Sequence, residues 1–353
     1  MLVFKPMKKH HIENWIKKKK EYRCTMTPNQ IFDGIRSGDT GALGSGITLI
    51  ESQHPEHRED ANELVKLCLA HRGDSMRVGI TGVPGVGKST FIESFGHVLT
   101  KHGKKVAVLT IDPTSSVSGG SILGDKTRMQ GLSTHDDVFI RPSPAGNTLG
   151  GVARKTRESI VLCEAAGYDV VLVETVGVGQ SETVVKSMVD FFLLLMLSGA
   201  GDELQGIKKG IMEMADALLI TKADGDNVKK AEIASSEYKN ALHLFPPNRN
   251  GWSPKVYTCS AIENRNIDWV YDMLQEFYEH VRNNGSLEES RKEQDKMWLA
   301  ESLRELISND FFANAGMLEE LKVMEDKVYK GELTSFQAAE QLYKLYVKKD
   351  GRV

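Results

Sequence analysis

The sequence predicts an α/β protein built on a doubly wound, mostly parallel sheet, with further helices at both ends. Between residues 74 and 284, short apolar runs alternate with amphipathic stretches. Most of these runs are continuous series of Val, Ile and Leu, which is typical of strands that helices cover on both faces. Strands that alternate with helices in this way favour a parallel sheet.

The alternation assigns each element to a stretch of the chain. Seven apolar runs are expected to form strands, at residues 77–81, 105–111, 138–141, 170–174, 191–197, 217–221 and 255–259. Amphipathic stretches between them are expected to form helices, at residues 89–100, 152–166, 205–214, 228–241 and 269–283.

The ends of the chain lack this alternation. Residues 1–73 are expected to form an N-terminal helical extension to the 74–284 domain, and residues 285–353 a C-terminal helical arm. Helices are expected in the arm at residues 288–307, 317–329 and 334–347. An apolar stripe on its first helix is typical of core, but it could also be the surface of a dimerisation arm; it contains Trp298, Leu299, Leu303, Leu306 and Ile307.

The composition is that of an ordinary globular chain and argues against several classes of function. Of 353 residues, 40% are hydrophobic and 26% are charged, and the net charge is -3. This near-balance removes the main electrostatic reason to expect nucleic-acid binding. The longest apolar run, at 191–197, is far shorter than the ~20 residues that span a bilayer. The first residues do not resemble a secretory signal. We therefore expect a cytoplasmic protein that binds neither nucleic acid nor a membrane.

The most specific motif is a glycine-rich segment at residues 82–89 that matches the pattern G-x-x-x-x-G-K-S/T. It follows an expected strand and opens an expected helix, as this motif requires. Its glycines allow a tight loop whose backbone N–H groups converge on phosphate oxygens, while Lys88 can reach the β- and γ-phosphates and Ser89 can ligate Mg²⁺. This phosphate-binding loop (P-loop) predicts nucleotide contacts from Gly82, Val83, Pro84, Gly85, Val86, Gly87, Lys88, Ser89 and Thr90.

Carboxylates at strand ends are candidate partners for the Mg²⁺ that accompanies a nucleotide. Glu174 ends an apolar run, so it should face the phosphate crevice at the carboxyl edge of the sheet. Asp112 ends the second expected strand, and Asp125 lies between the two motifs. Because Mg²⁺ prefers few carboxylates together with phosphates and waters, the direct ligands among these three acids stay open. Each acid could instead be a cap or turn residue.

A second strand end carries a base-recognition pattern, with Lys222 and Asp224 after the apolar run 217–221. The carboxylate can accept hydrogen bonds from N1–H and N2–H₂ of guanine. Adenine offers neither donor and would leave Asp224 unpaired, at a cost of about 1–3 kcal/mol. The pattern therefore favours GTP over ATP. Residues that end the next strand complete the expected nucleotide-binding set, namely Ser260, Ala261 and Ile262.

Together with three further segments, these motifs resemble the MeaB/ArgK family of GTPases, which includes the human methylmalonic aciduria type A protein. The segments are 112–115, 119–129 and 174–182, and the run Gly-Gly-Ser-Ile-Leu-Gly-Asp-Lys-Thr-Arg-Met at 119–129 is highly specific to the family. The resemblance covers roughly residues 28–347. It implies a P-loop NTPase fold with a G domain, a homodimer, and hydrolysis of GTP with Mg²⁺.

The resemblance also implies a partner. Members of the family are chaperones for methylmalonyl-CoA mutase: they gate delivery of adenosylcobalamin and protect or reactivate the enzyme. By this resemblance Lys88, Asp112 and Glu174 would be catalytic, and the metal would lie at or near Ser89, Asp112, Asp125 and Glu174. A switch loop would couple nucleotide state to the mutase through Asp202, Glu203, Gln205, Lys208 and Lys209.

Two positions depart from the usual GTPase pattern. Thr221 stands where the guanine motif N-K-x-D has an Asn that braces the phosphate loop, and a threonine can make only part of that contact. Gln180 comes three residues after Gly177 rather than directly after it, so the identity of the water-positioning residue stays open. We therefore expect slow intrinsic hydrolysis that a partner stimulates.

Two other functions are compatible with the same fold. A nickel metallochaperone would need clusters of Cys or His, but the 4 cysteines form no C-x-x-C pair and the 10 histidines show no H-x-x-x-H or H-E-x-x-H spacing. A P-loop kinase or ATPase linked to amino-acid transport, the source of the older ArgK label, should prefer ATP and would not need Asp224. Nucleotide preference separates the kinase from the GTPase.

Overall fold

The computed structural model of the chain forms two compact units, residues 1–291 and 292–353. The first unit holds the sheet and the helices that precede it, and the second holds helices alone. The sequence-based division at residues 73 and 284 stays a prediction. The structure describes residues 26–52, 54–111, 129–143, 149–175, 181–199, 209–246 and 248–349.

The sheet of the first unit has seven strands, each parallel to its neighbours, in the order β3-β2-β4-β1-β5-β6-β7. All seven predicted strands are confirmed, with ends that shift by at most two residues. The strands are β1 (Met76–Gly82), β2 (Val106–Ile111), β3 (Val138–Ser143), β4 (Val170–Thr175), β5 (Phe191–Leu197), β6 (Ala217–Thr221) and β7 (Lys255–Thr258).

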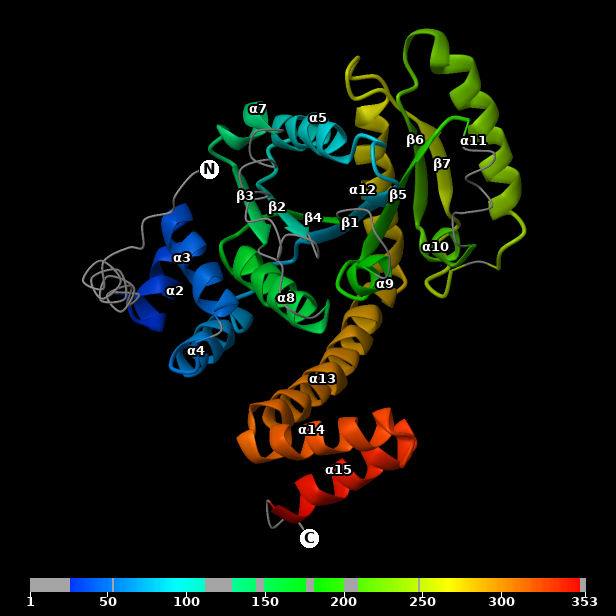
Figure 1. The fold of residues 1–353 in the computed structure, drawn as a ribbon. Helices are drawn as coiled ribbons and strands as arrows, with labels where there is room; N and C mark the ends of the chain where they lie inside the picture. The colour runs from blue at the N-terminus through cyan, green and yellow to red at the C-terminus, as the bar shows by residue number, and fades with distance from the viewer. Residues whose placement is uncertain are drawn as a thin grey trace, which may run out of the picture. The chain divides into compact units, whose positions relative to one another are not determined.

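Helices lie between the strands and pack on both faces of the sheet (Figure 1). On one face, α5 and α12 share an apolar core with β1 and β2. On the other, α8 contacts β2 and β4, and α9 contacts β1 and β4. The doubly wound fold class is therefore confirmed. The helices of this unit are α2 (Pro28–Arg36), α3 (Thr40–Glu51), α4 (His57–Leu69), α5 (Lys88–Lys101), α7 (Gln130–Ser133), α8 (Leu149–Ala165), α9 (Ser181–Lys186), α10 (Lys209–Met214), η2 (Gly225–Asn227), α11 (Val228–Leu242) and α12 (Ile267–Asn283).

The order in which the chain adds strands to the sheet changes direction beside β1. The chain runs to β2 and β3 on one side of β1 and later to β5, β6 and β7 on the other. In doubly wound sheets, ligands bind outside the carboxyl ends of the strands at this reversal. The loop that follows β1 therefore occupies the place where the fold offers a binding crevice.

The short helices α7 and α9 were not predicted, since each is too brief to show a helical period. The position of α9 depends on Gly79 in β1. A Cβ atom at Gly79 would lie 2.8 Å from Val185 Cγ1 and 3.0 Å from Val189 Cγ2, which is closer than real Cβ contacts. The missing side chain lets the end of α9 and the turn after it lie directly on β1.

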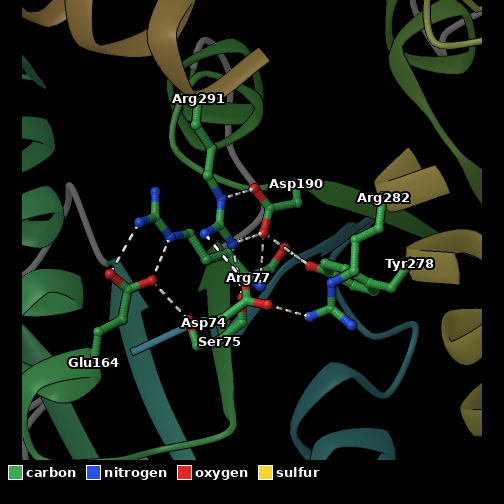
Figure 2. Close-up of polar contacts among 8 residues, drawn as sticks. All are labelled: Asp74, Ser75, Arg77, Glu164, Asp190, Tyr278, Arg282 and Arg291. Atoms are coloured by element: carbon green, nitrogen blue, oxygen red, sulfur yellow. Dashed lines mark hydrogen bonds and ion pairs between the residues drawn. The ribbon is translucent and has the colours of Figure 1, made fainter. Parts of the chain in front are cut away.

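A buried ionic cluster lies at the amino end of β1, opposite the binding crevice (Figure 2). Arg77 makes a two-pronged contact with Glu164 of α8, with Nε 2.7 Å from Oε1 and Nη2 3.0 Å from Oε2. Both side chains are almost fully buried. The Ser75 hydroxyl donates a third bond to Glu164 Oε1 over 2.7 Å. Because every charge here has a partner, the cluster can exist inside the protein.

Asp190, directly before β5, forms the other half of this cluster. Its carboxylate accepts bonds from Nε and Nη2 of Arg291, at 2.9 and 2.7 Å, and from the Tyr278 hydroxyl at 3.0 Å. Burial alone would raise the pKa of Asp190, but the hydrogen bonds and charge of Arg291 outweigh it and lower the pKa. The cluster therefore holds the N-terminal turns of α13 (Ser286–Ala313) and the C-terminal half of α12 against the start of two central strands.

The second unit has a small core of its own, around Met317, Met324 and Leu342. It is built from the later part of α13 together with α14 (Ala315–Tyr329) and α15 (Ser335–Lys349). The helix α13, which was expected at residues 288–307, is longer than predicted and covers Ser286–Ala313. Across the described ranges, no helix is both long and apolar enough to cross a membrane.

Candidate nucleotide-binding site

The phosphate loop joins the end of β1 to the start of α5, as the motif predicted. Gly82, Gly85 and Gly87 have φ values of 155°, 79° and 95°, in the region that L side chains rarely adopt. At Gly82 a Cβ atom would also lie 2.5 Å from the Leu195 carbonyl oxygen of β5. The glycines are therefore required by the shape of the loop and by its close approach to the neighbouring strand.

Lys88 lies at the first position of α5 and its side chain folds back over the loop. Its ammonium donates a hydrogen bond to the Gly82 carbonyl oxygen over 2.9 Å. Burial lowers the pKa of Lys88, and the nearby carboxylates of Glu174 and Glu182 oppose this shift. The ammonium group of Lys88 is thus held inside the loop, and the nearby carboxylates balance its positive charge only in part. An anionic group bound at this place would balance the rest.

Ser89 and Glu174 meet beside the loop. The Ser89 hydroxyl donates to Glu174 Oε1 over 3.3 Å. The parallel register sets this contact: Glu174 of β4 pairs with Ile80 of β1, so the buried carboxylate lies next to the strand that leads into the loop. A hydroxyl and a carboxylate are hard oxygen donors that suit Mg²⁺, which completes its shell with phosphates and waters. The pair therefore fits a nucleotide-bound Mg²⁺.

The base-recognition segment lies directly against the phosphate loop. The Thr221 hydroxyl is 2.7 Å from the Val86 carbonyl oxygen of the loop. Lys222 has a φ of 55°, and its Cε atom is 3.9 Å from the place where a Cβ of Gly87 would be. The two motifs, 135 residues apart at Val86 and Thr221, are thus in direct contact.

Asp224 is held in place by Ser260, the residue that the sequence analysis placed after the last strand. The buried Ser260 hydroxyl donates to Asp224 Oδ2 over 2.7 Å and accepts a bond from the Glu263 backbone N–H at 3.1 Å. Both bonds orient the hydroxyl toward the carboxylate. Asp224 is half-buried, and the adjacent Ile262 is 78% exposed, so this end of the site is open to a ligand.

Ser94 supports the same loop and was missed by the sequence analysis. Its hydroxyl, on α5, donates to the Ala261 carbonyl oxygen over 2.8 Å and so fixes a peptide unit next to Ser260. No local pattern could have identified Ser94, because its partner lies 167 residues away in the chain.

Several predicted site residues cannot be placed. Asp112, Asp125, Asp202, Glu203, Gln205 and Lys208 lie outside the described residues, as does Gln180. Lys209 opens α10. The described geometry therefore concerns the phosphate loop, Glu174 and the base-recognition residues.

The model of a known family matches most of the chain. The family is described as "Methylmalonyl Co-A mutase-associated GTPase MeaB", and the match covers residues 43–316. The chain is also 37% identical to a solved structure described as an LAO/AO transport system kinase, with a TM-score of 0.72, over 90% of this chain and 97% of that one.

Curated relatives agree with the family match. The chain is 48% identical to GTPase ArgK of Escherichia coli, over 79% of this chain and 85% of the relative. It is 44% identical to the mitochondrial methylmalonic aciduria type A homolog of Mus musculus, over 90% of this chain and 79% of the relative. The chain therefore belongs to the MeaB family of methylmalonyl-CoA mutase-associated GTPases.

Proposed function

We propose that this site binds GTP with Mg²⁺ and hydrolyses it slowly to GDP and phosphate. The observation that carries the proposal is the meeting of Lys88, the Ser89–Glu174 pair and Asp224 along one edge of the sheet. Hydrolysis in general is supported by the family and by relatives that are named GTPases.

Each group has a role in this proposal. Lys88 carries a positive charge to the β- and γ-phosphates, where charge develops during phosphoryl transfer. Ser89 and Glu174 hold Mg²⁺ or its waters, with Asp112 and Asp125 as further candidate partners. Asp224 accepts the two N–H donors of guanine, while Ser260, Ala261 and Ile262 border the base.

The protein that responds to GTP hydrolysis is proposed to be an adenosylcobalamin-dependent methylmalonyl-CoA mutase. The family description names this enzyme, and the mouse relative carries the name of methylmalonic aciduria. In this account the chain gates cofactor loading and protects the mutase, and residues 201–209 transmit the nucleotide state. The described site offers a phosphate region and a base region, which suits a protein whose output is a conformation.

A homodimer is part of the same proposal. In the second unit, α13 exposes a row of large apolar side chains, of which Leu299 is 73% and Leu303 is 55% exposed. Leu306 and Ile307 extend the row. A surface of this kind on a helix indicates an interface, because isolated apolar residues do not repeat at helical spacing. The cytoplasmic location also stays a prediction.

The mutase proposal is tested by pairing the purified protein with the methylmalonyl-CoA mutase of its host. We expect a complex and a raised rate of GTP hydrolysis. The variant with both Lys208 and Lys209 changed to Ala should lose the stimulation and keep the basal rate. Absence of both complex and stimulation, in every nucleotide state, would overturn the chaperone role and leave a GTPase without this client. If the mutase still stimulates the double variant, the partner remains supported, but residues 201–209 do not transmit the nucleotide state.

The alternative of a P-loop kinase has one observation in its favour, the description of the 37%-identical solved structure as a transport system kinase. The contact between Ser260 and Asp224 favours guanine recognition instead, because it orients a carboxylate that can accept from N1–H and N2–H₂ of guanine, two donors that adenine lacks. Preference for ATP would support the kinase.

A further inference from the structure

We propose that Asn227 is a positioning residue for base recognition. Its side-chain amide holds the Lys222 carbonyl and thereby fixes the short segment that presents Asp224 to guanine. This inference rests on the proposed function, since it deepens the role given to Asp224. Asn227 belongs to neither of the motifs from which the site was predicted.

Three hydrogen bonds tie Asn227 to its surroundings. Its Nδ2 donates to the Lys222 carbonyl oxygen over 2.6 Å, and its backbone N–H donates to the Asp224 carbonyl oxygen over 2.9 Å. The Ser198 hydroxyl, which follows β5, donates to Asn227 Oδ1 over 2.7 Å. Asn227 therefore contacts the segment at both of its recognition residues and links it to the end of a neighbouring strand.

The chemistry of these partners requires an amide. The Lys222 carbonyl can only accept a hydrogen bond, so the NH₂ group of Asn227 must face it and the amide oxygen must face Ser198. An aspartate at this position would place a carboxylate oxygen against the carbonyl oxygen. The substitution Asn227→Asp thus preserves the size of the side chain and replaces an attraction by a repulsion.

The common structural reason for an asparagine at this place does not apply. Asn227 precedes α11 at the N-cap position, where Asn usually accepts a bond from a backbone N–H of the first helical turn. Its side chain makes no such bond. The amide is directed to Lys222 and Ser198 instead, so its contacts serve the recognition segment rather than the helix.

The segment held by Asn227 has a backbone that needs support. Lys222 has a φ of 55°, in the left-handed region, where the Cβ atom of a residue other than glycine lies too close to the following carbonyl oxygen. Ser260 fixes the carboxylate of Asp224 from one side, and Asn227 fixes the backbone on the other. Loss of the amide should let the segment relax, which misaligns Asp224 with the base and leaves the phosphate contacts in place.

The test compares the dissociation constants of GTP and inosine triphosphate, because hypoxanthine lacks the 2-amino group that Asp224 would bind. In Asn227→Ala, GTP binding should weaken about fivefold to tenfold, the loss of roughly one hydrogen bond. In Asn227→Asp it should weaken at least as much, because a repulsion replaces the lost bond. Binding of inosine triphosphate should change by less than about twofold, since it depends less on this alignment. The preference for GTP should therefore shrink, whereas kcat at saturating GTP should stay near that of the unchanged protein.

Asn248→Ala is the matched control. Asn248 Nδ2 donates to Asp216 Oδ1 over 3.0 Å at the opposite end of β6, so this variant loses one amide hydrogen bond away from the nucleotide. Its preference for GTP should not change. Ser198→Ala removes a hydroxyl from a partly exposed position and should reduce the preference in the same direction, which provides a third variant if an Asn227 variant does not fold.

The variant Asp224→Ala shows whether a negative result contradicts only the role of Asn227 or the proposed base recognition itself. If Asp224→Ala abolishes the preference and folded variants of Asn227 and Ser198 retain it, then Asn227 does not position the segment and the inference alone is wrong. If Asp224→Ala itself leaves the preference intact, then Asp224 does not read the base. The proposed base recognition is then overturned, and the inference with it.

Discussion

The hydroxyl of Thr221 lies 2.7 Å from the carbonyl oxygen of Val86, and this contact joins the base-recognition segment to the phosphate loop. The same hydroxyl is 3.2 Å from the Met196 carbonyl oxygen of β5. A hydroxyl has a single proton to donate, and the shorter distance favours the bond to the loop. A threonine at the usual place of Asn therefore supplies a brace to the phosphate loop with its only donor.

Thr221→Val should weaken the binding of GTP and GDP about equally, by about fivefold, because a buried carbonyl of the loop loses its donor. The preference for GTP over inosine triphosphate should not change, since Asp224 is untouched. Dissociation constants from fluorescent nucleotide titration measure both effects. The matched control is Thr156→Val, in which a buried hydroxyl also loses its bond to a backbone carbonyl, on α8. Unaltered affinity in folded Thr221→Val would show that the brace is dispensable.

The affinity for GTP should fall as the pH rises through the alkaline range, and it should do so below the pH at which ordinary lysines titrate. Burial lowers the pKa of Lys88, so the neutral amine, which binds phosphate poorly, forms at a lower pH than usual. A bound triphosphate favours the charged amine, and binding should therefore take up protons in this range. Calorimetric titration from neutral pH to about pH 10 measures the effect. The Lys88→Met variant should take up fewer protons than the unchanged protein. Guanine N1–H also loses its proton in the alkaline range, but that contribution is common to both proteins, so equal uptake in both would assign the effect elsewhere.

Asp224→Asn should weaken GTP binding and shift the preference toward xanthosine triphosphate. Xanthine presents an oxygen where guanine presents its amino group, so the amide donor of Asn can form the pairing that the carboxylate formed before. Competition binding of both nucleotides to both proteins measures the shift. A preference that does not move would exclude Asp224 as the base-recognition residue.

Breaking the buried pair at the amino end of β1 should destabilise the protein strongly. Glu164→Leu leaves the Arg77 guanidinium buried without its carboxylate, which should cost about 3–5 kcal/mol of unfolding free energy. The double variant Arg77→Met, Glu164→Leu should lose much less than the sum of its single changes. Denaturant unfolding checks both statements. Glu293→Gln, in an exposed pair with Lys296, is the control and should change stability by less than about 1 kcal/mol. Additive losses would show that the two side chains do not act as a pair.

The sequence was sufficient for the sheet because its strands are continuous apolar runs, a pattern that survives in the structure as fully buried strands such as β1 and β4. The phosphate loop was predictable for a related reason: Gly82, Lys88 and Ser89 lie within one short segment whose spacing encodes its shape. Glu174 was found because it ends such a run, and Asp224 because it follows one at the spacing of the base-recognition pattern.

Contacts between distant segments could not be predicted in this way. Ser94, Ser198 and Asn227 support the recognition loops through bonds to partners that no periodicity or local motif indicates. The brace from Thr221 was expected to be partial, because a threonine can make only part of the contact that an asparagine makes. Its length of 2.7 Å to the Val86 carbonyl oxygen could not be predicted, since the two residues lie 135 positions apart. Short helices were missed for a different reason, since six residues in α9 are too few to show a helical period.

The central claim, that this site hydrolyses GTP with Lys88 at the phosphates, is tested most directly by steady-state phosphate release with GTP or ATP and Mg²⁺. The unchanged protein should hydrolyse GTP slowly and ATP no faster than the background rate. Lys88→Ala, shown to be folded by its circular dichroism spectrum, should release no phosphate above background. Equal hydrolysis of ATP and GTP, or hydrolysis of GTP by folded Lys88→Ala at the rate of the unchanged protein, would contradict the account.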